Sequence, residues 1–200
     1  LRAPQGKIGY QYLSGRKLSE ETMKKFGLGF ANVTSNDLVA YLRSKGYTDD
    51  VIQEAGLASF DEKYGMHDKF WNRVMFPIQD INHRVIGFGG RVMGDAKPKY
   101  LNSPETMIFD KSRNLYGLNF ARTSRKNNII LCEGYMDVIA VHAAGMPNAV
   151  ATLGTAITAE QARIMARYTK EVVIAYDMDD AGRRAADRAM KLLADVEVDV

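Results

Sequence analysis

The spacing of hydrophobic and polar positions predicts short helices and then a hairpin in the first part of the chain. Residues 1–14 show no clear period and predict extended or irregular chain. Three amphipathic patterns that end near a glycine predict helices at residues 19–27, 36–45 and 49–55, the first and third capped by Ser19 and Thr48. The pattern then becomes strand-like, and residues 72–79 and 85–92 flank a polar turn, which predicts an antiparallel hairpin. Pro77 marks an edge or a bulge in this hairpin.

Beyond a polar, basic segment at residues 121–128, strand-like and helix-like patterns alternate. Strands are expected at residues 129–133, 148–152, 172–176 and from 196, and helices at residues 136–144, 158–169 and 181–195. Strand–helix alternation with apolar strands implies a parallel sheet that is flanked by helices and joined by right-handed crossovers. We therefore predict an α/β chain with an α+β subdomain that contains the hairpin at residues 1–126, and a βαβ subdomain at residues 127–200.

Charge is divided unevenly between these two parts. Residues 1–126 hold 20 Lys and Arg against 13 Asp and Glu, a net charge of +7, whereas residues 127–200 hold 7 against 11, a net charge of −4. A basic part joined to an acidic part suits an anionic polymer held by one and a metal ion held by the other, although chance clustering of solvated charges gives the same numbers.

Composition narrows the class of protein further. The 46% hydrophobic content is that of an ordinary globular protein, and no apolar run approaches the roughly 18 residues of a membrane span. The single cysteine, Cys132, excludes an internal disulfide framework and fits a reducing compartment. The chain opens Leu1-Arg2-Ala3-Pro4 without an initiator methionine, which predicts that it is an excised piece of a longer protein.

Acidic residues stand where two predicted strands end. Glu133 follows the strand at residues 129–133 and Asp137 lies four residues on, while Asp177 and Asp179 follow the strand at residues 172–176. In an α/β sheet the carboxyl ends of strands are where ligands bind, and carboxylates gathered there repel one another unless a divalent cation joins them. Oxygen ligands select Mg²⁺ or Mn²⁺. We therefore predict a magnesium site.

The second acidic stretch, residues 177–182, has other interpretations. A calcium EF-hand loop fails because its fifth position is Ala181 and its twelfth is Arg188. An aspartyl-phosphate phosphotransferase also uses Asp-x-Asp after a strand, and spacing does not exclude it. Solvated strand-end acids without a ligand remain open as well. Asp180 is expected to point elsewhere and to cap the helix that begins near Ala181.

A loop-rich stretch at residues 93–114 carries the clearest candidate for a nucleic-acid surface. Its centre places Lys97, Lys99, Tyr100 and Asn102 between and beside two prolines. Lysines neutralise phosphates and an aromatic ring can stack on a base, so this composition suits single-stranded nucleic acid. An ordinary surface loop has the same composition, and that alternative stays open.

Several motifs, in sequence order, closely resemble bacterial DNA primases of the DnaG type. The stretches that carry the resemblance are residues 73–78, 85–91, 98–106, 115–117, 133–138 and 177–182. The last two are similar to the acidic motifs of the Toprim module, which primases share with topoisomerases and some nucleases. Met178 stands where the family often has glycine. It lies between the expected ligands, so we expect no loss of metal binding.

The resemblance implies a nucleotidyltransferase, a DNA-directed RNA polymerase that uses ribonucleoside triphosphates to make short RNA primers on single-stranded DNA for replication. Glu133, Asp177 and Asp179 would be catalytic and would hold Mg²⁺ together with Asp137, and Mn²⁺ could substitute. The side chains expected to bind nucleotide or template are Arg91, Lys99, Tyr100, Asn102 and Lys111, with Arg73 and Arg16 as weaker members of the same groove.

The resemblance also implies that residues 1–200 are part of a larger protein. Family members carry an N-terminal zinc-binding domain, a C-terminal domain that binds the replicative helicase, and a further acidic motif, so zinc and helicase would bind only outside this chain and the Toprim part would be truncated at its C-terminal end. The protein would act in the bacterial cytoplasm at the replication fork, without a membrane. Another Toprim enzyme, a topoisomerase or nuclease, and a non-catalytic, metal-braced nucleic-acid-binding module remain alternatives.

Overall fold

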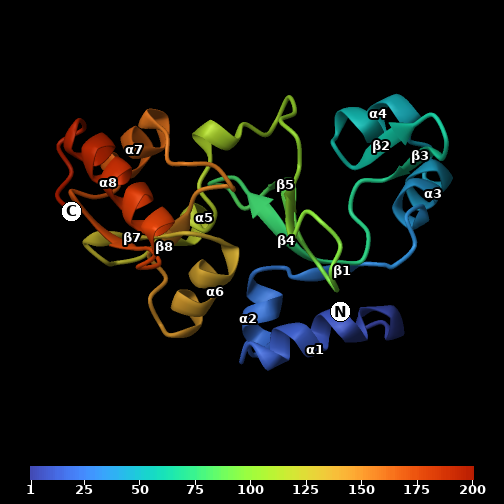
Figure 1. Cartoon of the computed structure of the whole chain (residues 1–200), viewed down its shortest axis with the longest axis horizontal. Coiled ribbons are helices and arrows are strands. Elements are labelled where there is room, and N and C mark those ends of the chain that lie inside the picture. The colour runs from blue at the N-terminus through green and yellow to red at the C-terminus, as the bar shows by residue number, and fades with distance from the viewer. The chain divides into compact units, whose positions relative to one another are not determined.

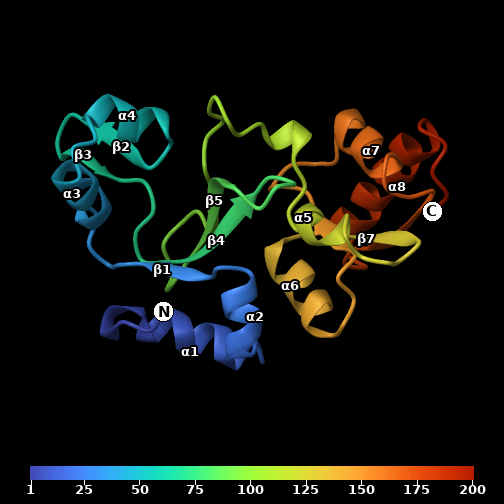
Figure 2. The same cartoon turned by 180° about the vertical axis from the view of Figure 1, so that it is seen from behind.

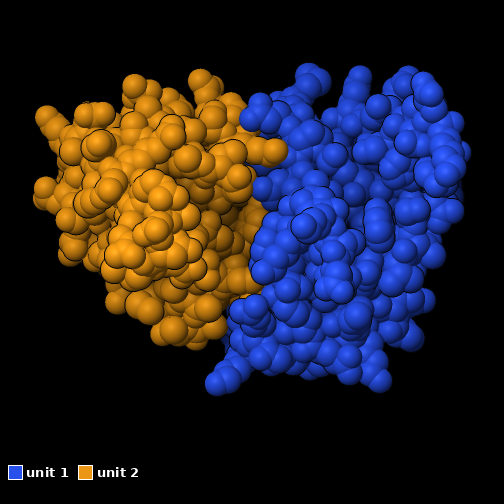
Figure 3. All heavy atoms as spheres, in the orientation of Figure 1, with its two compact units in different colours: residues 1–78, 86–109 blue, residues 79–85, 110–200 orange.

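The computed structural model describes all 200 residues, which divide into two compact units (Figure 3). Unit 1 comprises residues 1–78 and 86–109, and unit 2 comprises residues 79–85 and 110–200. This division differs from the predicted one at residue 126, because residues such as Leu115 and Leu118 belong to the hydrophobic core of the parallel sheet. The predicted division of function between a basic part and a metal-binding part stays a prediction.

Unit 1 contains an antiparallel four-stranded sheet and a separate two-stranded hairpin (Figure 1). Its elements are η1 (Pro4–Gly6), α1 (Lys7–Gly15), α2 (Glu20–Lys25), β1 (Gly29–Ala31), α3 (Asp37–Ser44), α4 (Asp49–Glu54), β2 (Ala58–Asp61), β3 (Gly65–Asp68), β4 (Arg73–Gln79), β5 (Val85–Val92) and β6 (Tyr100–Asn102). The sheet order is β1-β4-β5-β6, so the predicted hairpin of β4 and β5 is confirmed. Pairing with β1 reaches only from Arg73 to Met75, so β4 has a free edge at Pro77, as predicted.

Helix α1 corrects the prediction of extended or irregular chain at residues 1–14. Leu13 is fully buried, and Gly9 lies so close to Phe30 that an added Cβ would stand 2.8 Å from the ring. The helix has no side-chain cap and two of its nine residues are glycines. Packing against distant residues therefore holds it, rather than local propensity, which is why its sequence shows little period.

Unit 2 is a parallel sheet with flanking helices, as predicted. Its elements are η2 (Lys111–Arg113), α5 (Leu118–Ala121), β7 (Asn128–Cys132), α6 (Tyr135–Ala143), β8 (Ala149–Ala151), α7 (Ala159–Ala166), β9 (Glu171–Ala175) and α8 (Asp180–Ala194). The strand order is β8-β7-β9, and both pairs are parallel. The strand predicted from residue 196 is reduced to one parallel bridge between Glu171 and Asp199.

Helices cover the two faces of this parallel sheet unequally. Side chains of β7 and β9, among them Leu131 and Val172, form one hydrophobic core with Met165 of α7 and Leu193 of α8. Figures 1 and 2 both place α6 on the other side of the strands. The opposite face of β9 is more open, since the Val173 side chain is 43% exposed. The best-packed part of unit 2 therefore lies between the sheet and the α7–α8 pair.

The contribution of this core can be measured by truncating one buried side chain. Leu131 is fully buried at the centre of the sheet, so Leu131→Ala should lower the free energy of unfolding by about 2–5 kcal/mol. Val173→Ala, on the open face of β9, should cost less than about 1 kcal/mol. Equilibrium urea unfolding of both variants tests this. Equal losses would contradict the placement of the core.

Candidate active site

The carboxyl ends of β7 and β9 bring two of the predicted acids together. The strands are neighbours and pair in register from Asn128 with Glu171 to Cys132 with Ala175. Glu133 therefore leaves the sheet directly after one strand, and Asp177 two residues after the other. The acidic edge is defined here as Glu133, Asp137, Asp177 and Asp179, all of which are exposed.

The backbone at this edge is closely packed. The Asp177 amide donates a hydrogen bond of 2.9 Å to Oε1 of Glu133, which ties the end of β7 to the loop after β9. Gly182 of α8 faces the same point. A Cβ there would collide with the Asp177 carbonyl oxygen and lie 2.9 Å from Oε1 of Glu133. Glycine is thus required for α8 to begin so close to the two acids.

The other two acids of the edge act as helix caps. Oδ2 of Asp137 accepts from the Gly134 amide at 3.2 Å, and Oδ1 of Asp179 accepts from the Gly182 amide at 2.7 Å. This corrects the prediction that Asp180 caps the last helix, because α8 begins one residue earlier than expected and Asp179 becomes its N-cap. No three acidic, histidine or cysteine side chains gather at metal-binding distance. The edge therefore supplies oxygen donors on adjacent strand ends without a closed cluster.

Two groups beside the edge, buried Cys132 and partly buried Tyr176, remain protonated at neutral pH. Burial raises the pKa of the Cys132 thiol to about 12, with Asp137 adding to the shift. Burial also raises the pKa of Tyr176 to about 12, with Glu133 adding to it. Both shifts favour the neutral form, so neither group adds negative charge to the edge. Cys132 is a small, buried core residue.

In unit 1, three predicted binding residues meet around a tyrosine that the sequence analysis did not select. The Tyr12 ring has the Arg91 guanidinium 4.2 Å from its centroid and the Arg16 guanidinium at 5.6 Å. Arg91 also hydrogen-bonds Tyr100, whose pKa is raised by burial and by the nearby Tyr12 hydroxyl. These four residues are called the Tyr12 cluster. The i,i+4 spacing of Tyr12 and Arg16 is the sequence signal for this contact once α1 is known to be a helix.

Arg73 is placed differently from the other predicted cations. It is only 4% exposed, and its Nη1 donates to the carbonyl oxygens of Gly90 at 3.2 Å and Pro98 at 3.0 Å. Burial lowers its pKa. These contacts brace β4 against β5 and the loop before β6, so the guanidinium serves the sheet and does not face solvent.

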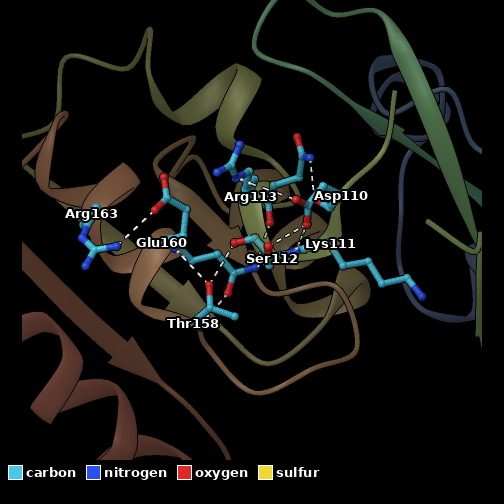
Figure 4. Close-up of polar contacts among 9 residues, drawn as sticks. Asp110, Lys111, Ser112, Arg113, Thr158, Glu160 and Arg163 are labelled. Atoms are coloured by element: carbon cyan, nitrogen blue, oxygen red, sulfur yellow. Dashed lines mark hydrogen bonds and ion pairs between the residues drawn. The ribbon is translucent and has the colours of Figure 1, made fainter. Parts of the chain in front are cut away.

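The remaining predicted residues lie on two separate segments. Lys99 is exposed, and Asn102 pairs with Gly89 across β5 and β6 in unit 1. Lys111 opens η2 in unit 2, and Figure 4 shows its side chain extended away from a cluster of hydrogen bonds that fixes its main chain. The structure thus groups Arg16, Arg91 and Tyr100 with Tyr12. It places Glu133 and Asp177 after adjacent strand ends, and Asp137 and Asp179 at the starts of the helices that follow.

The acidic edge, on a three-stranded parallel sheet, defines the class of the second unit. A family model described as Toprim-like matches residues 130–200. A model of the DNA primase catalytic core, N-terminal domain, matches residues 1–122. The chain therefore belongs to the family of DnaG-type DNA primase catalytic cores. Each helix of the chain is too short or too polar to be a membrane span.

Relatives and solved structures agree with this assignment. DNA primase from Clostridium acetobutylicum is 48% identical over 191 residues, which cover 95% of this chain and 32% of that protein. DNA primase from Synechococcus elongatus is 42% identical, over 98% of this chain and 29% of that protein. A primase domain from Pseudomonas aeruginosa superposes with a TM-score of 0.88 at 44% identity, covering 96% of this chain and 61% of the other. A DnaG catalytic domain bound to single-stranded DNA gives 0.87 at 42% identity, with the same coverage. The chain spans about a third of the curated relatives' length.

The close packing at Gly182 gives a test of the edge that does not depend on activity. Alanine normally stabilises a helix by about 1 kcal/mol relative to glycine. Gly182→Ala should instead destabilise, by about 1–3 kcal/mol, because the methyl group collides with the Asp177 carbonyl. Gly15→Ala, where an added Cβ meets nothing within 4 Å, is the control and should be neutral or stabilising. Thermal unfolding measures both. A stabilising Gly182→Ala would disprove the close approach.

Proposed function

We propose that this chain is the part of a DNA primase that joins ribonucleotides into short RNA primers on single-stranded DNA. The observation that supports it is the acidic edge. In a chain of the primase catalytic-core family, Glu133 and Asp177 stand at the ends of two adjacent parallel strands. Activity, substrates and partners of the whole protein are inferred here from this core.

Primases with a Toprim module use metal ions, and Mg²⁺ is proposed for this chain. Glu133, Asp177 and Asp179 would hold it, with Asp137 beside them. The chemistry of the donor set fits, since these are exposed oxygen ligands that follow the carboxyl ends of the adjacent strands β7 and β9, although their side chains are not gathered around one point in this structure. When bound, the ion would stabilise the charge that develops as a 3′-hydroxyl attacks the α-phosphate of a ribonucleoside triphosphate and pyrophosphate leaves.

The basic side chains of the chain would hold the anionic substrates. Arg91 and Arg16 are oriented by the Tyr12 ring and have no carboxylate partner among the ion pairs of the structure, so their guanidinium groups are suited to phosphate oxygens. Lys99 and Lys111 would add phosphate contacts as point charges. Tyr100 and Asn102 would position a base or sugar.

The template and partners follow from the same family. A solved DnaG catalytic domain that is 42% identical to this chain is bound to single-stranded DNA, which supports the same class of template here. The replicative helicase would bind through a separate domain of the full-length protein. The complete enzyme would work at the replication fork in the bacterial cytoplasm, where ribonucleoside triphosphates are available.

The acids can be tested in the full-length protein with a single-stranded template, labelled ribonucleotides and Mg²⁺. Glu133→Gln and Asp177→Ala should each lower the rate of primer synthesis by on the order of a hundredfold, because each removes a charged oxygen ligand. Asp187→Asn, an exposed acid further along α8, is the matched control and should keep the wild-type rate. Chelation of the metal should abolish synthesis.

Two outcomes would count against this proposal. Near wild-type synthesis by Glu133→Gln or Asp177→Ala would remove these acids from the chemistry. Template binding by the wild-type protein without any primer synthesis would favour a non-catalytic nucleic-acid-binding module instead.

The Tyr12 cluster gives a second test, in which template affinity is measured. Tyr12→Phe keeps the ring under both guanidinium groups and should bind single-stranded DNA within twofold of wild type. Tyr12→Leu removes the cation–π contacts and should bind about three- to tenfold more weakly, because Arg16 and Arg91 lose their orientation. Fluorescence anisotropy with a labelled oligodeoxynucleotide at one fixed salt concentration measures both, with melting curves to confirm folding. Equal affinities for the two variants would reject the role of the ring.

A further inference from the structure

Gln161 of α7 is a fully buried polar side chain whose bonding groups are all used. Its relative exposure is 0%. Oε1 accepts from the Thr158 amide at 3.0 Å, and Nε2 donates to the carbonyl oxygens of Lys111 and Asn114, each at 2.9 Å. An amide is costly to bury without partners, and this one has three. Two of the three lie about fifty residues earlier in the chain, on the segment that carries Lys111.

Thr158, the N-cap of the same helix, holds a third carbonyl of that segment. Its Oγ1 accepts from the Gln161 amide at 3.1 Å and donates to the Ser112 carbonyl at 2.9 Å. The carbonyl groups of Lys111, Ser112 and Asn114 are therefore all fixed by two side chains at the start of α7. Figure 4 shows these hydrogen bonds converging on the segment.

The segment needs such support because it has little regular structure of its own. From Lys111 to Asn114 its only element is the three-residue turn η2, and its local bonds come from Asp110, whose carboxylate accepts from the Ser112 amide at 2.8 Å. Only Tyr116, at its far end, is anchored separately, by a bridge to Ala151. Short 3₁₀ turns have poor hydrogen-bond geometry and are weakly stable alone. The Lys111 side chain extends away from these hydrogen bonds (Figure 4), so the position of the Lys111 main chain sets the region that its amine can contact.

We propose that Gln161, with Thr158, is a positioning residue for nucleotide binding, which acts by holding the main chain of Lys111. The inference rests on the proposed function, in which Lys111 contacts a ribonucleotide phosphate. A displacement of a binding group by about 1 Å is enough to weaken a productive complex. Loss of the two hydrogen bonds from Nε2 should therefore weaken nucleotide binding, although Gln161 itself touches no substrate.

The side-chain chemistry offers a selective variant. Gln161→Glu keeps an oxygen for the Thr158 amide, and so keeps the helix cap. Its second oxygen offers the Lys111 and Asn114 carbonyls at most one hydrogen, when protonated, where the amide Nε2 offers two, so at least one of the two bonds is lost. Arg163→Ala is the matched control. It breaks only the exposed pair with Glu160, 3.2 Å apart on the same helix, and leaves the Lys111 segment untouched.

The experiment compares full-length wild type, Gln161→Glu, Arg163→Ala, Lys111→Ala and the double variant Gln161→Glu/Lys111→Ala. Primer synthesis on a single-stranded template gives kcat and the KM for ribonucleoside triphosphate, and hydrogen exchange reports the amides of residues 111–116. Gln161→Glu should speed exchange in this segment and raise KM by about five- to tenfold with kcat within about twofold. Arg163→Ala should match wild type. The KM penalty of Gln161→Glu should vanish when Lys111 is already alanine.

The possible results distinguish the positioning role of Gln161 from the proposed primase function. Unchanged exchange at residues 111–116 in Gln161→Glu overturns the inference, whatever the activity. So does a KM penalty that persists in the Lys111→Ala background, because Gln161 would then act through something other than Lys111. A Lys111→Ala variant with wild-type KM refutes the proposed nucleotide contact of Lys111 and the inference with it. Absence of primer synthesis by the wild type refutes the proposed function, and in that case the exchange of segment 111–116 still decides whether Gln161 holds it.

Discussion

The parallel pairing of β7 with β9 is the constraint on which the acidic edge depends. Because side chains alternate along a strand, a slip of one residue between the two would exchange buried for exposed positions and move Glu133 away from Asp177. Buried Leu131 and Val172 hold the register within the strands, and the hydrogen bond from the Asp177 amide to Glu133 holds it at their carboxyl ends. The positions of the exposed carboxylates Glu133 and Asp177 thus depend on the hydrophobic core that fixes the register of β7 and β9.

Several cations in this chain are held by groups that do not neutralise them. An aromatic ring holds Arg16 and Arg91, and main-chain carbonyl groups hold Arg73. The carboxylate ion pairs lie elsewhere, as with Arg43 and Asp49 at 2.7 Å. A guanidinium fixed by a ring, as in Arg16 and Arg91, keeps its full charge toward solvent or substrate, whereas one fixed by a carboxylate does not. This arrangement preserves the positive potential of a part of the chain whose net charge the sequence already shows to be basic.

Local signals were sufficient for most elements that are stabilised by their own residues, although the short hairpin of β2 and β3 was not predicted. The caps at Ser19, Thr48 and Thr158 and the strand–helix alternation after residue 128 are confirmed because their causes lie within a few residues. Elements stabilised by distant partners were missed. Helix α1 depends on packing, β1 and β6 are three-residue strands defined by their neighbours, and the contact of Gln161 with Lys111 spans fifty residues. The cap formed by Asp179 in place of Asp180 shows how a shift of one residue at a helix start changes which acid is the cap.

The burial of Cys132 makes the chain convenient for site-specific labelling. The thiol is 1% exposed and its pKa is raised to about 12, so it stays protonated and out of reach of thiol-directed dyes at neutral pH. Since it is the only cysteine in these 200 residues, a cysteine introduced at an exposed position would be the only reactive thiol of this chain. Spectroscopic probes can therefore be placed on either unit without first removing a native cysteine from the sheet that supports the acidic edge.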